Sequence, residues 1–354
     1  MTSRIPTLLL TALAALSGAA SAADCPPAGS AQFICGPRNA EDLAPLPGSG
    51  WVIAAGMTDA KHPQGRLYLV NARDHAWAGA WPDKPLQQPD PAYRDCAAPD
   101  QAVFAPHGLS LREGKNGHHT LYAVNHGGRE SIVVFAVDAS GAKPTLTWQG
   151  CVVLPKGASA NSVAALPEGG FALTHFADMT DPKLGEKLRG GVNTGYVLEW
   201  HPTRGWHKLE GSDMSAPNGN ATSADGKYLF VGGWAGKSVV RFERGSKAAP
   251  RSVATGFLTD NVKLASDGSV LAAGQNAAVD AIMSCVNAPD GDACKPGTSA
   301  VKIDPNSFAV TPLFKYDNAA FANGTVAVEV GDEWWVGTFA GDRIARFKQA
   351  APAR

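Results

Sequence analysis

One short pattern recurs six times along the chain: a strand, a turn that holds Gly with Asp, Glu or Ser, a second strand, a loop and a third strand. The units begin at Leu46, Leu111, Leu166, Ser223, Ala265 and Val330. Their starts lie about 40 to 65 residues apart, near or above the length of a four-stranded propeller blade. Because a single blade cannot bury both of its faces, blades stack around an axis. The repeat therefore predicts an all-β, six-bladed β-propeller with a central channel, and two packed β-sandwiches are the alternative.

The first 22 residues have the features of a secretory signal peptide. Arg4 precedes an apolar run, and Ala20, Ser21 and Ala22 supply a small-residue cleavage site. No later apolar run approaches the roughly 20 residues that a membrane-spanning helix needs. We therefore expect a signal peptide over residues 1–22, a single propeller domain over residues 23–354, and a periplasmic or secreted protein.

Charge limits the partners that the chain can attract. The 31 Lys and Arg residues nearly balance 32 Asp and Glu residues, which leaves a formal net charge of -1. Without a basic surface field, nucleic acid and anionic lipid are not expected partners. A small, nearly neutral substrate is favoured, and the oligomeric state is left open.

Six cysteines in an oxidising compartment could form three disulfides, and the spacing leaves several connectivities open. Chain proximity favours Cys25 with Cys35 and Cys285 with Cys294, which leaves Cys96 with Cys151. No pair has CxxC spacing, so a zinc ion bound through thiolates is not expected.

Each unit carries polar residues shortly before its turn. In a propeller the innermost strand of each blade runs beside the channel, so equivalent residues of the six units should converge on the axis. These residues are Glu41 and Asp42, His107, Asn161 and Ser162, Asn218, Asp260 and Asn261, and Asn323. Each alone could be an ordinary turn residue. Their shared position in six units indicates a site on the axis.

Most of these side chains offer oxygen atoms rather than nitrogen or sulfur. Calcium takes about six to eight oxygen ligands, whereas zinc prefers His and Cys. The oxygen donors are Glu41, Asn161, Asn218, Asp260 and Asn261. Two carboxylates would balance one Ca²⁺, and their mutual repulsion should destabilise the site without the ion. We therefore expect a calcium ion in the channel.

Several motifs occur in an order that resembles one family. They are EDLAPLP from Glu41, FAPHGLS from Phe104, LYAVNH ending at His126, ANSVAALPEGGF from Ala160, APNGNATSADGKYLFV from Ala216, LTDNVKL from Leu258, and NGTVAVEV with WWVGTF near the end. Together they resemble the calcium-dependent paraoxonases, six-bladed arylesterase and lactonase propellers within the wider gluconolactonase and strictosidine-synthase-like group. The resemblance implies a catalytic calcium on the same five oxygen donors that strand position indicates.

The resemblance also implies an activity, the hydrolysis of lactones or aryl esters with calcium polarising the carbonyl. His107, in PHG, would be the general base on the attacking water. His126, in VNH, would orient it or relay the proton. A second, structural calcium would lie at Asp42 and the Leu109 carbonyl, although Ser162 stands where the family has Asp.

Three further residues are candidates for the substrate pocket. Gln275 stands where the family's pocket has a histidine, His175 ends a strand on the pocket side, and Asn323 belongs to the axial set. His118 and His119 fall in a turn and are expected to face solvent.

The segment from Asp178 to Gly191 interrupts the third unit with some helical character. It is either a lid over the channel mouth or a surface insertion.

Two other functions stay open. One is a gluconolactonase-type sugar lactonase with a single divalent metal, and the other is a propeller that binds a ligand without catalysis. The chain has no GxSxG elbow and no HExxH motif, so a serine hydrolase and a zinc protease lack support.

Overall fold

The computed structural model describes residues 25–286 and 295–350. The predicted signal peptide and Cys294, the expected partner of Cys285, lie outside these residues. Among the residues described, no helix is long and apolar enough to cross a membrane.

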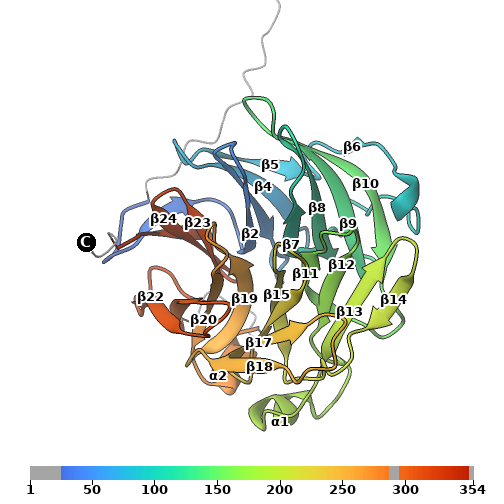
Figure 1. Cartoon of the computed structure of the whole chain (residues 1–354). Helices are drawn as coiled ribbons and strands as arrows, with labels where there is room; N and C mark the ends of the chain where they lie inside the picture. The colour runs from blue at the N-terminus through green and yellow to red at the C-terminus, as the bar shows by residue number, and fades with distance from the viewer. Residues whose placement is uncertain (1–24, 287–294, 351–354) are drawn as a thin grey trace, which may run out of the picture.

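Six sheets surround a central axis in the described part of the chain (Figure 1). We number the blades along the chain. Blade 1 contains β2 (Ala40–Leu46), β3 (Trp51–Gly56), β4 (Arg66–Asn71) and β5 (Trp77–Trp81); blade 2 contains β7 (Pro106–Arg112), β8 (His118–Asn125), β9 (Ser131–Asp138) and β10 (Thr145–Val153), with β6 (Leu86–Gln87) parallel to β10. Blade 3 contains β11 (Ala160–Ala165), β12 (Phe171–His175), β13 (Tyr196–His201) and β14 (Gly205–Lys208); blade 4 contains β15 (Pro217–Thr222), β16 (Tyr228–Gly233), β17 (Ser238–Glu243) and β18 (Arg251–Ala254). Blade 5 contains β19 (Leu258–Leu264), β20 (Val270–Asn276), β21 (Gly297–Ile303) and β22 (Val310–Tyr316); blade 6 contains β23 (Gly324–Val330), β24 (Glu333–Thr338), β25 (Arg343–Lys348) and β1 (Gln32–Cys35). The predicted all-β, six-bladed propeller is confirmed.

The first strand of the described residues completes the last blade. β1 pairs antiparallel with β25, with Gln32 opposite Arg346 and Cys35 opposite Arg343. Hydrogen bonds between the two ends of the chain therefore close the ring. A disulfide joins Cys25 to Cys35 at the end of β1, as predicted.

The second predicted disulfide within the described residues is also present. It joins Cys96, in the loop before blade 2, to Cys151 in β10. The bond joins residues that are 55 positions apart in the sequence. It therefore links the Pro-rich segment before blade 2 to β10.

Strand alternation explains why the blades stack. In β8, Leu121 and Ala123 pack in the cluster between blades 1 and 2, whereas the alternate residues Tyr122 and Val124 pack in the cluster between blades 2 and 3. Successive side chains of a strand point to opposite faces, so both faces of an apolar strand are buried only if a blade lies on each side. The continuous apolar run of this strand therefore requires the ring.

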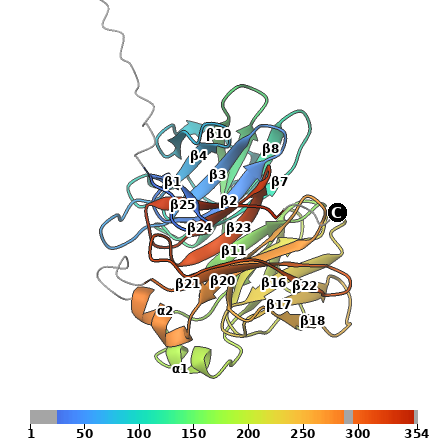
Figure 2. The ribbon, with the colours of Figure 1, turned by 90° about the vertical axis from the view of Figure 1, so that its left-hand side faces the viewer.

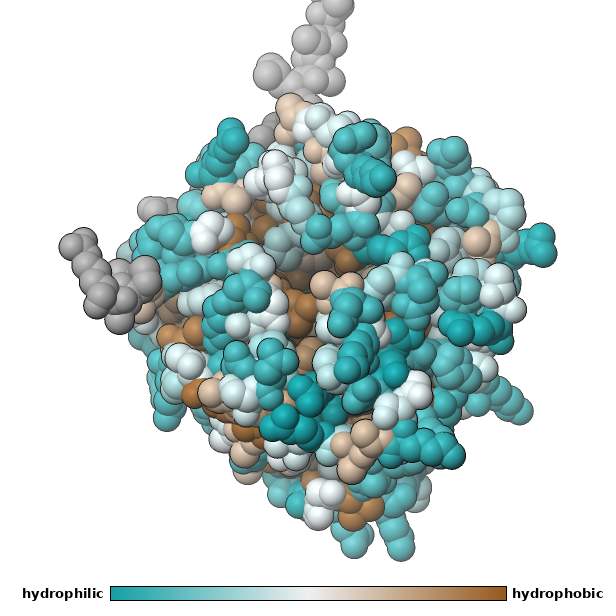
Figure 3. Space-filling model, viewed as in Figure 1, coloured by the Kyte–Doolittle hydropathy of each residue, from teal (hydrophilic) through white to brown (hydrophobic). Residues whose placement is uncertain are grey.

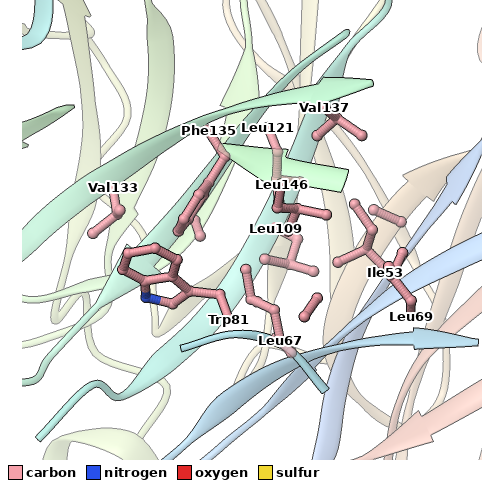
Figure 4. Packing of buried hydrophobic residues seen from close by; sticks show 14 of the residues in the cluster. Ile53, Leu67, Leu69, Trp81, Leu109, Leu121, Val133, Phe135, Val137 and Leu146 are labelled. Atoms are coloured by element: carbon pink, nitrogen blue, oxygen red, sulfur yellow. The ribbon is translucent and has the colours of Figure 1, made fainter. Parts of the chain in front are cut away.

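The cluster between blades 1 and 2 is built around Trp81, which is fully buried (Figure 4). Its ring meets Phe135 edge to face, with ring centroids 5.4 Å apart. Leu67 and Leu109 pack beside it without exposed surface. Full burial of a side chain of this size contributes roughly 1.5–3 kcal/mol to stability.

Three short helices interrupt the strands of the described chain: η1 (Pro91–Tyr93), α1 (Leu184–Arg189) and α2 (Val279–Val286). α1 and α2 lie side by side in both ribbon views (Figures 1 and 2), and Arg189 Nη1 donates to Asp280 Oδ1 at 2.8 Å. α1 belongs to the segment for which the sequence predicted helical character. On the face seen in Figure 1, the surface is hollowed near the axis, with apolar residues visible inside the hollow (Figure 3).

Candidate metal centre and active site

Each of the six inner strands has an irregularity in its pairing with the next strand of its blade. The register shifts lie between Ala40 and Asp42, Pro106 and Leu109, Ala160 and Val163, Pro217 and Asn220, Thr259 and Val262, and Gly324 and Ala327. A β-bulge of this kind adds a residue and interrupts strict alternation. The bulge therefore changes the direction of neighbouring side chains, and the predicted axial residues lie at these bulges, except Asn323, which precedes β23.

A cavity of about 520 Å³ opens over this ring of residues. Its lining includes residues that the sequence predicted for the axis, namely Glu41, His107, Asn161, Asn218 and Asp260. His126 lines it as well. Asn261, the fifth predicted ligand, lies behind Glu41 and donates from Nδ2 to Glu41 Oε1 at 2.5 Å. The structure thus brings together residues from blades 1 to 5.

Four buried oxygens of the predicted ligand set have no hydrogen-bond partner among the described residues. They are Glu41 Oε2, Asn161 Oδ1, Asn218 Oδ1 and Asn261 Oδ1. A buried polar atom without a partner costs about 1–3 kcal/mol, so four in one place call for a ligand. In the described chain no three His, Cys, Asp or Glu side chains form a metal-binding group, so amide oxygens would supply much of the coordination. An oxygen-rich donor set of this kind fits calcium.

The electrostatics of the same residues also fit a cation. Burial, together with the neighbouring Asp42 carboxylate, raises the pKa of Glu41 to about 8. Burial and the charge of Glu41 raise the pKa of Asp260 well above its usual value. Both shifts mean that ionised carboxylates are unfavourable here without a compensating positive charge.

The two predicted catalytic histidines are in contact. His107 Nδ1 lies 3.0 Å from His126 Nε2, and His107 Nε2 lies 3.6 Å from Glu41 Oε2. Burial lowers the pKa of His107 to about 4, so its imidazole is neutral at neutral pH, as a general base requires. A third residue extends the chain, because His126 Nδ1 lies 2.8 Å from Glu130 Oε1. The sequence did not predict a role for Glu130.

The atoms predicted for a second calcium are bonded to a lysine. Lys263 Nζ, from β19, donates to Asp42 Oδ2 and to the Leu109 carbonyl, each at 2.7 Å. The Leu109 amide also donates to Asp42 Oδ2, at 2.6 Å. An ammonium group and a calcium ion cannot share these positions. In this arrangement the positive charge beside Asp42 is therefore the chain's own, a second ion at this position would have to displace Lys263, and that ion stays a prediction.

The three residues predicted to line the pocket lie behind the cavity wall. Gln275 is fully buried, donates to Asp260 Oδ2 at 2.6 Å and accepts from Trp234 Nε1 at 2.9 Å. His175 is 5% exposed, and its Nδ1 accepts from the amide of Ser159 at 3.0 Å. Asn323 is 1% exposed. None of the three lines the cavity.

Blade 6 places a different residue in the cavity. Thr325, the second residue of β23, lines it, and its hydroxyl donates to the Glu41 carbonyl at 2.5 Å. Glu41, His107, Asn161 and Asn218 are also the second residues of their strands. Choosing the second residue of the inner strand in blade 6 would therefore have identified Thr325 rather than Asn323.

The prediction for the turn histidines was half wrong. The side chain of His118 is 64% exposed, as expected. His119 is only 8% exposed, because its position in β8 turns it inward, where Nδ1 accepts from the Gly114 amide at 3.2 Å.

The rest of the cavity wall is apolar over α1 and α2 and polar beside blade 1, where Arg38, Asn39, Thr58, Asp59 and Lys61 line it. It includes Leu184 and Leu188 of α1, Ile282 of α2, and the aromatic residues Trp234 and Phe339. The segment interpreted as a lid or a surface insertion thus contributes directly to the cavity.

No family model and no curated protein matches this chain. Among solved structures, a protein provisionally described as a gluconolactonase has a TM-score of 0.53 and 15% identity, over 92% of this chain and 94% of that one. A luciferin-regenerating enzyme has a TM-score of 0.53 and 12% identity, over 91% of this chain and 97% of that one. The neighbours are thus gluconolactonase-like six-bladed propellers, and at these identities the likeness shows the fold alone. The paraoxonase resemblance stays a prediction.

Proposed function

We propose that the protein is a calcium-dependent hydrolase of lactones or aryl esters. The observation that carries the proposal is the juxtaposition of four unpartnered buried oxygens with a pair of contacting histidines at one cavity. The fold of gluconolactonase-like neighbours is compatible with this activity.

One calcium ion would be held by Glu41, Asn161, Asn218, Asp260 and Asn261. The chemistry that it supplies when bound is polarisation of the carbonyl and stabilisation of the negative charge that develops on its oxygen. The chain itself orients these ligands: Gln275 donates to Asp260, and Asn261 donates to Glu41.

His107 is the residue best placed to activate water. Its neutral ring can accept a proton at Nε2, the nitrogen on the side of Glu41, while Nδ1 stays bonded to His126. Because burial keeps the ring neutral, the base is available without prior deprotonation.

The apolar part of the wall favours the proposal over a sugar lactonase. The hydroxyls of a sugar lactone need polar partners once they leave water, and the part of the wall formed by α1 and α2 is apolar, whereas Arg38, Asn39 and Asp59 line another part. Leu184, Leu188 and Ile282 instead suit an alkyl or aryl group.

We further propose that the protein works in the periplasm or outside the cell. The disulfides Cys25–Cys35 and Cys96–Cys151 support an oxidising compartment.

The test is a panel of aryl esters, alkyl lactones and sugar lactones, assayed with calcium and with excess EGTA. His107→Gln should lower turnover by about 10²- to 10⁴-fold, the usual contribution of a general base, while calcium binding persists. His118→Gln is the matched control, because that side chain is largely exposed. Full turnover by His107→Gln or in EGTA would contradict the mechanism. Inactivity on the whole panel would favour a non-catalytic binding propeller, and preference for sugar lactones would favour the gluconolactonase alternative.

A further inference from the structure

We infer that Glu130 is a positioning residue that fixes which nitrogen of each histidine carries a proton, so that His107 presents a free lone pair to the cavity. The inference deepens the proposed function and rests on it for its catalytic consequence. For two neutral rings, the arrangement of protons follows from the contacts.

The contacts form a line from Glu130 to the cavity. An ionised carboxylate only accepts hydrogen bonds, so the 2.8 Å contact with Glu130 Oε1 requires the proton of neutral His126 to lie on Nδ1. Its Nε2 is then an acceptor, and the 3.0 Å contact requires His107 to donate from Nδ1. Neutral His107 therefore carries no proton on Nε2, the nitrogen that lies 3.6 Å from Glu41 Oε2.

The backbone anchors the carboxylate at the other end of the line. Glu130 Oε2 accepts from the amide of Ala160 at 3.4 Å, and the Glu130 carbonyl accepts from the amide of Leu154 at 3.1 Å. Ala160 begins β11 and directly precedes the predicted ligand Asn161. Glu130 thus connects the histidine pair of blade 2 to the inner strand of blade 3. The same carboxylate contacts His126 and the residue that precedes the predicted calcium ligand Asn161.

The same line leads from the interior to solvent. The side chain of His107 is 13% exposed, whereas those of His126 and Glu130 are 30% and 33% exposed. After Nε2 of His107 takes a proton from water, its Nδ1 proton can pass to Nε2 of His126. The Nδ1 proton of His126 then passes to Glu130 and on to solvent, which leaves both rings neutral with their protons on Nε2. The starting state returns when His107 gives its Nε2 proton to the leaving alkoxide oxygen and protons pass back along the same line.

Three variants separate the parts of this role. Glu130→Ala removes the acceptor, so His126 is free to carry its proton on Nε2, which would force His107 to hold a proton on Nε2. Glu130→Gln keeps an acceptor without the charge, and Glu130→Asp keeps the charge on a shorter chain. Glu210→Gln, at an exposed position, is the matched control.

The first readout is ¹⁵N NMR of histidine side chains in the calcium-loaded protein, with His126 signals assigned from a His126→Asn spectrum. We expect His126 to be protonated at Nδ1 in the wild type and in Glu130→Gln, and to shift towards Nε2 in Glu130→Ala. A wild-type His126 protonated at Nε2, or an unchanged tautomer in Glu130→Ala, would overturn the inference whatever the activity.

The second readout is steady-state kinetics on the best substrate of the panel. Loss of a partner that orients a functional histidine costs about 10- to 100-fold, so kcat of Glu130→Ala should fall by that factor with little change in KM. Glu130→Gln should recover part of the loss, and Glu210→Gln should match the wild type. Equal kcat in wild type and Glu130→Ala would overturn the role in catalysis. A wild type that is inactive on all substrates but shows the expected tautomers would instead overturn the proposed function and leave the proton arrangement standing.

Discussion

Replacing Lys263 with Met would remove a positive charge from the channel while keeping much of the side chain's volume. Lys263 lies on blade 5, and its ammonium bonds Asp42 of blade 1 and the Leu109 carbonyl of blade 2. The Asp42 carboxylate is fully buried, and the Lys263 side chain is 15% exposed. The substitution therefore leaves a buried charge without its ionic partner.

The cost can be worked from these contacts. Removing one member of a buried ion pair costs about 3–5 kcal/mol, because the other charge stays buried. Asp42 keeps two backbone donors, the amides of Leu43 at 2.8 Å and Leu109 at 2.6 Å, so we expect the lower end, about 3 kcal/mol. With an unfolding entropy of ~2.1 cal/mol/K per residue, a chain of this length should lose about 4 °C in Tm.

Blade 5 also offers a matched control. Lys302 Nζ lies 2.7 Å from Asp267 Oδ2, the same distance as in the buried pair, but Asp267 is 55% exposed. An exposed pair contributes about 0–1 kcal/mol, so Lys302→Met should change Tm by little more than 1 °C. The assay is thermal unfolding of both variants, in calcium and in EGTA. The double variant Asp42→Asn with Lys263→Met should recover part of the loss, because it removes the unpaired charge.

Calcium stoichiometry completes the test. If the ammonium is the cation of this position, the wild type should bind one ion per chain, and Lys263→Met should gain extra stability at high calcium as an ion takes the vacated place beside Asp42. Two ions bound to the wild type would refute the reasoning. Equal Tm values for Lys263→Met and Lys302→Met would refute it as well.

Four further predictions concern the ring and its packing. Removing calcium with EGTA should lower stability by about 2.7 kcal/mol relative to an ion concentration of 100 Kd, measured as a Tm shift. Gln275→Leu, which removes a donor to Asp260, should weaken calcium binding by about 10- to 100-fold in calorimetry, and unchanged affinity would contradict its role. Trp81→Ala should cost about 3–5 kcal/mol in urea unfolding, because the side chain is fully buried, and a loss below 1 kcal/mol would argue against the packing. Replacing Cys96 and Cys151 with Ser should cost about 2–4 kcal/mol, whereas an unchanged midpoint would mean that the bond does not constrain the fold.

The blades could be predicted from sequence because each is a local unit. Its hairpins join strands that follow one another, and the turn pattern recurs with each blade. The closing strand β1, Gln32–Cys35, could not be assigned in this way, since its partner β25 lies at the other end of the chain. Pairing over such a separation leaves no local pattern in either strand.

The residues of the candidate site differ in the same way: some could be predicted from a local sequence pattern, and others could not. Residues at a repeated strand position, such as Glu41 and Asn161, could be found by counting from the turns. Lys263 and Glu130 could not, because their roles depend on contacts between different blades. Gln275 was assigned to the pocket by resemblance. It does not line the cavity, and it donates a hydrogen bond to the predicted calcium ligand Asp260.

The bulges in the inner strands change where neighbouring side chains point. In a regular strand of blade 1, neighbouring side chains would point to opposite faces, one towards blade 2 and the other towards blade 6. Yet Glu41 Oε1 accepts from Asn261 of blade 5, and Asp42 Oδ2 accepts from Leu109 of blade 2. The register shift between Ala40 and Asp42 permits both contacts. The bulge therefore allows β2 to give one side chain, Glu41, to the ring of predicted cation ligands and the next, Asp42, to the ion pair with Lys263.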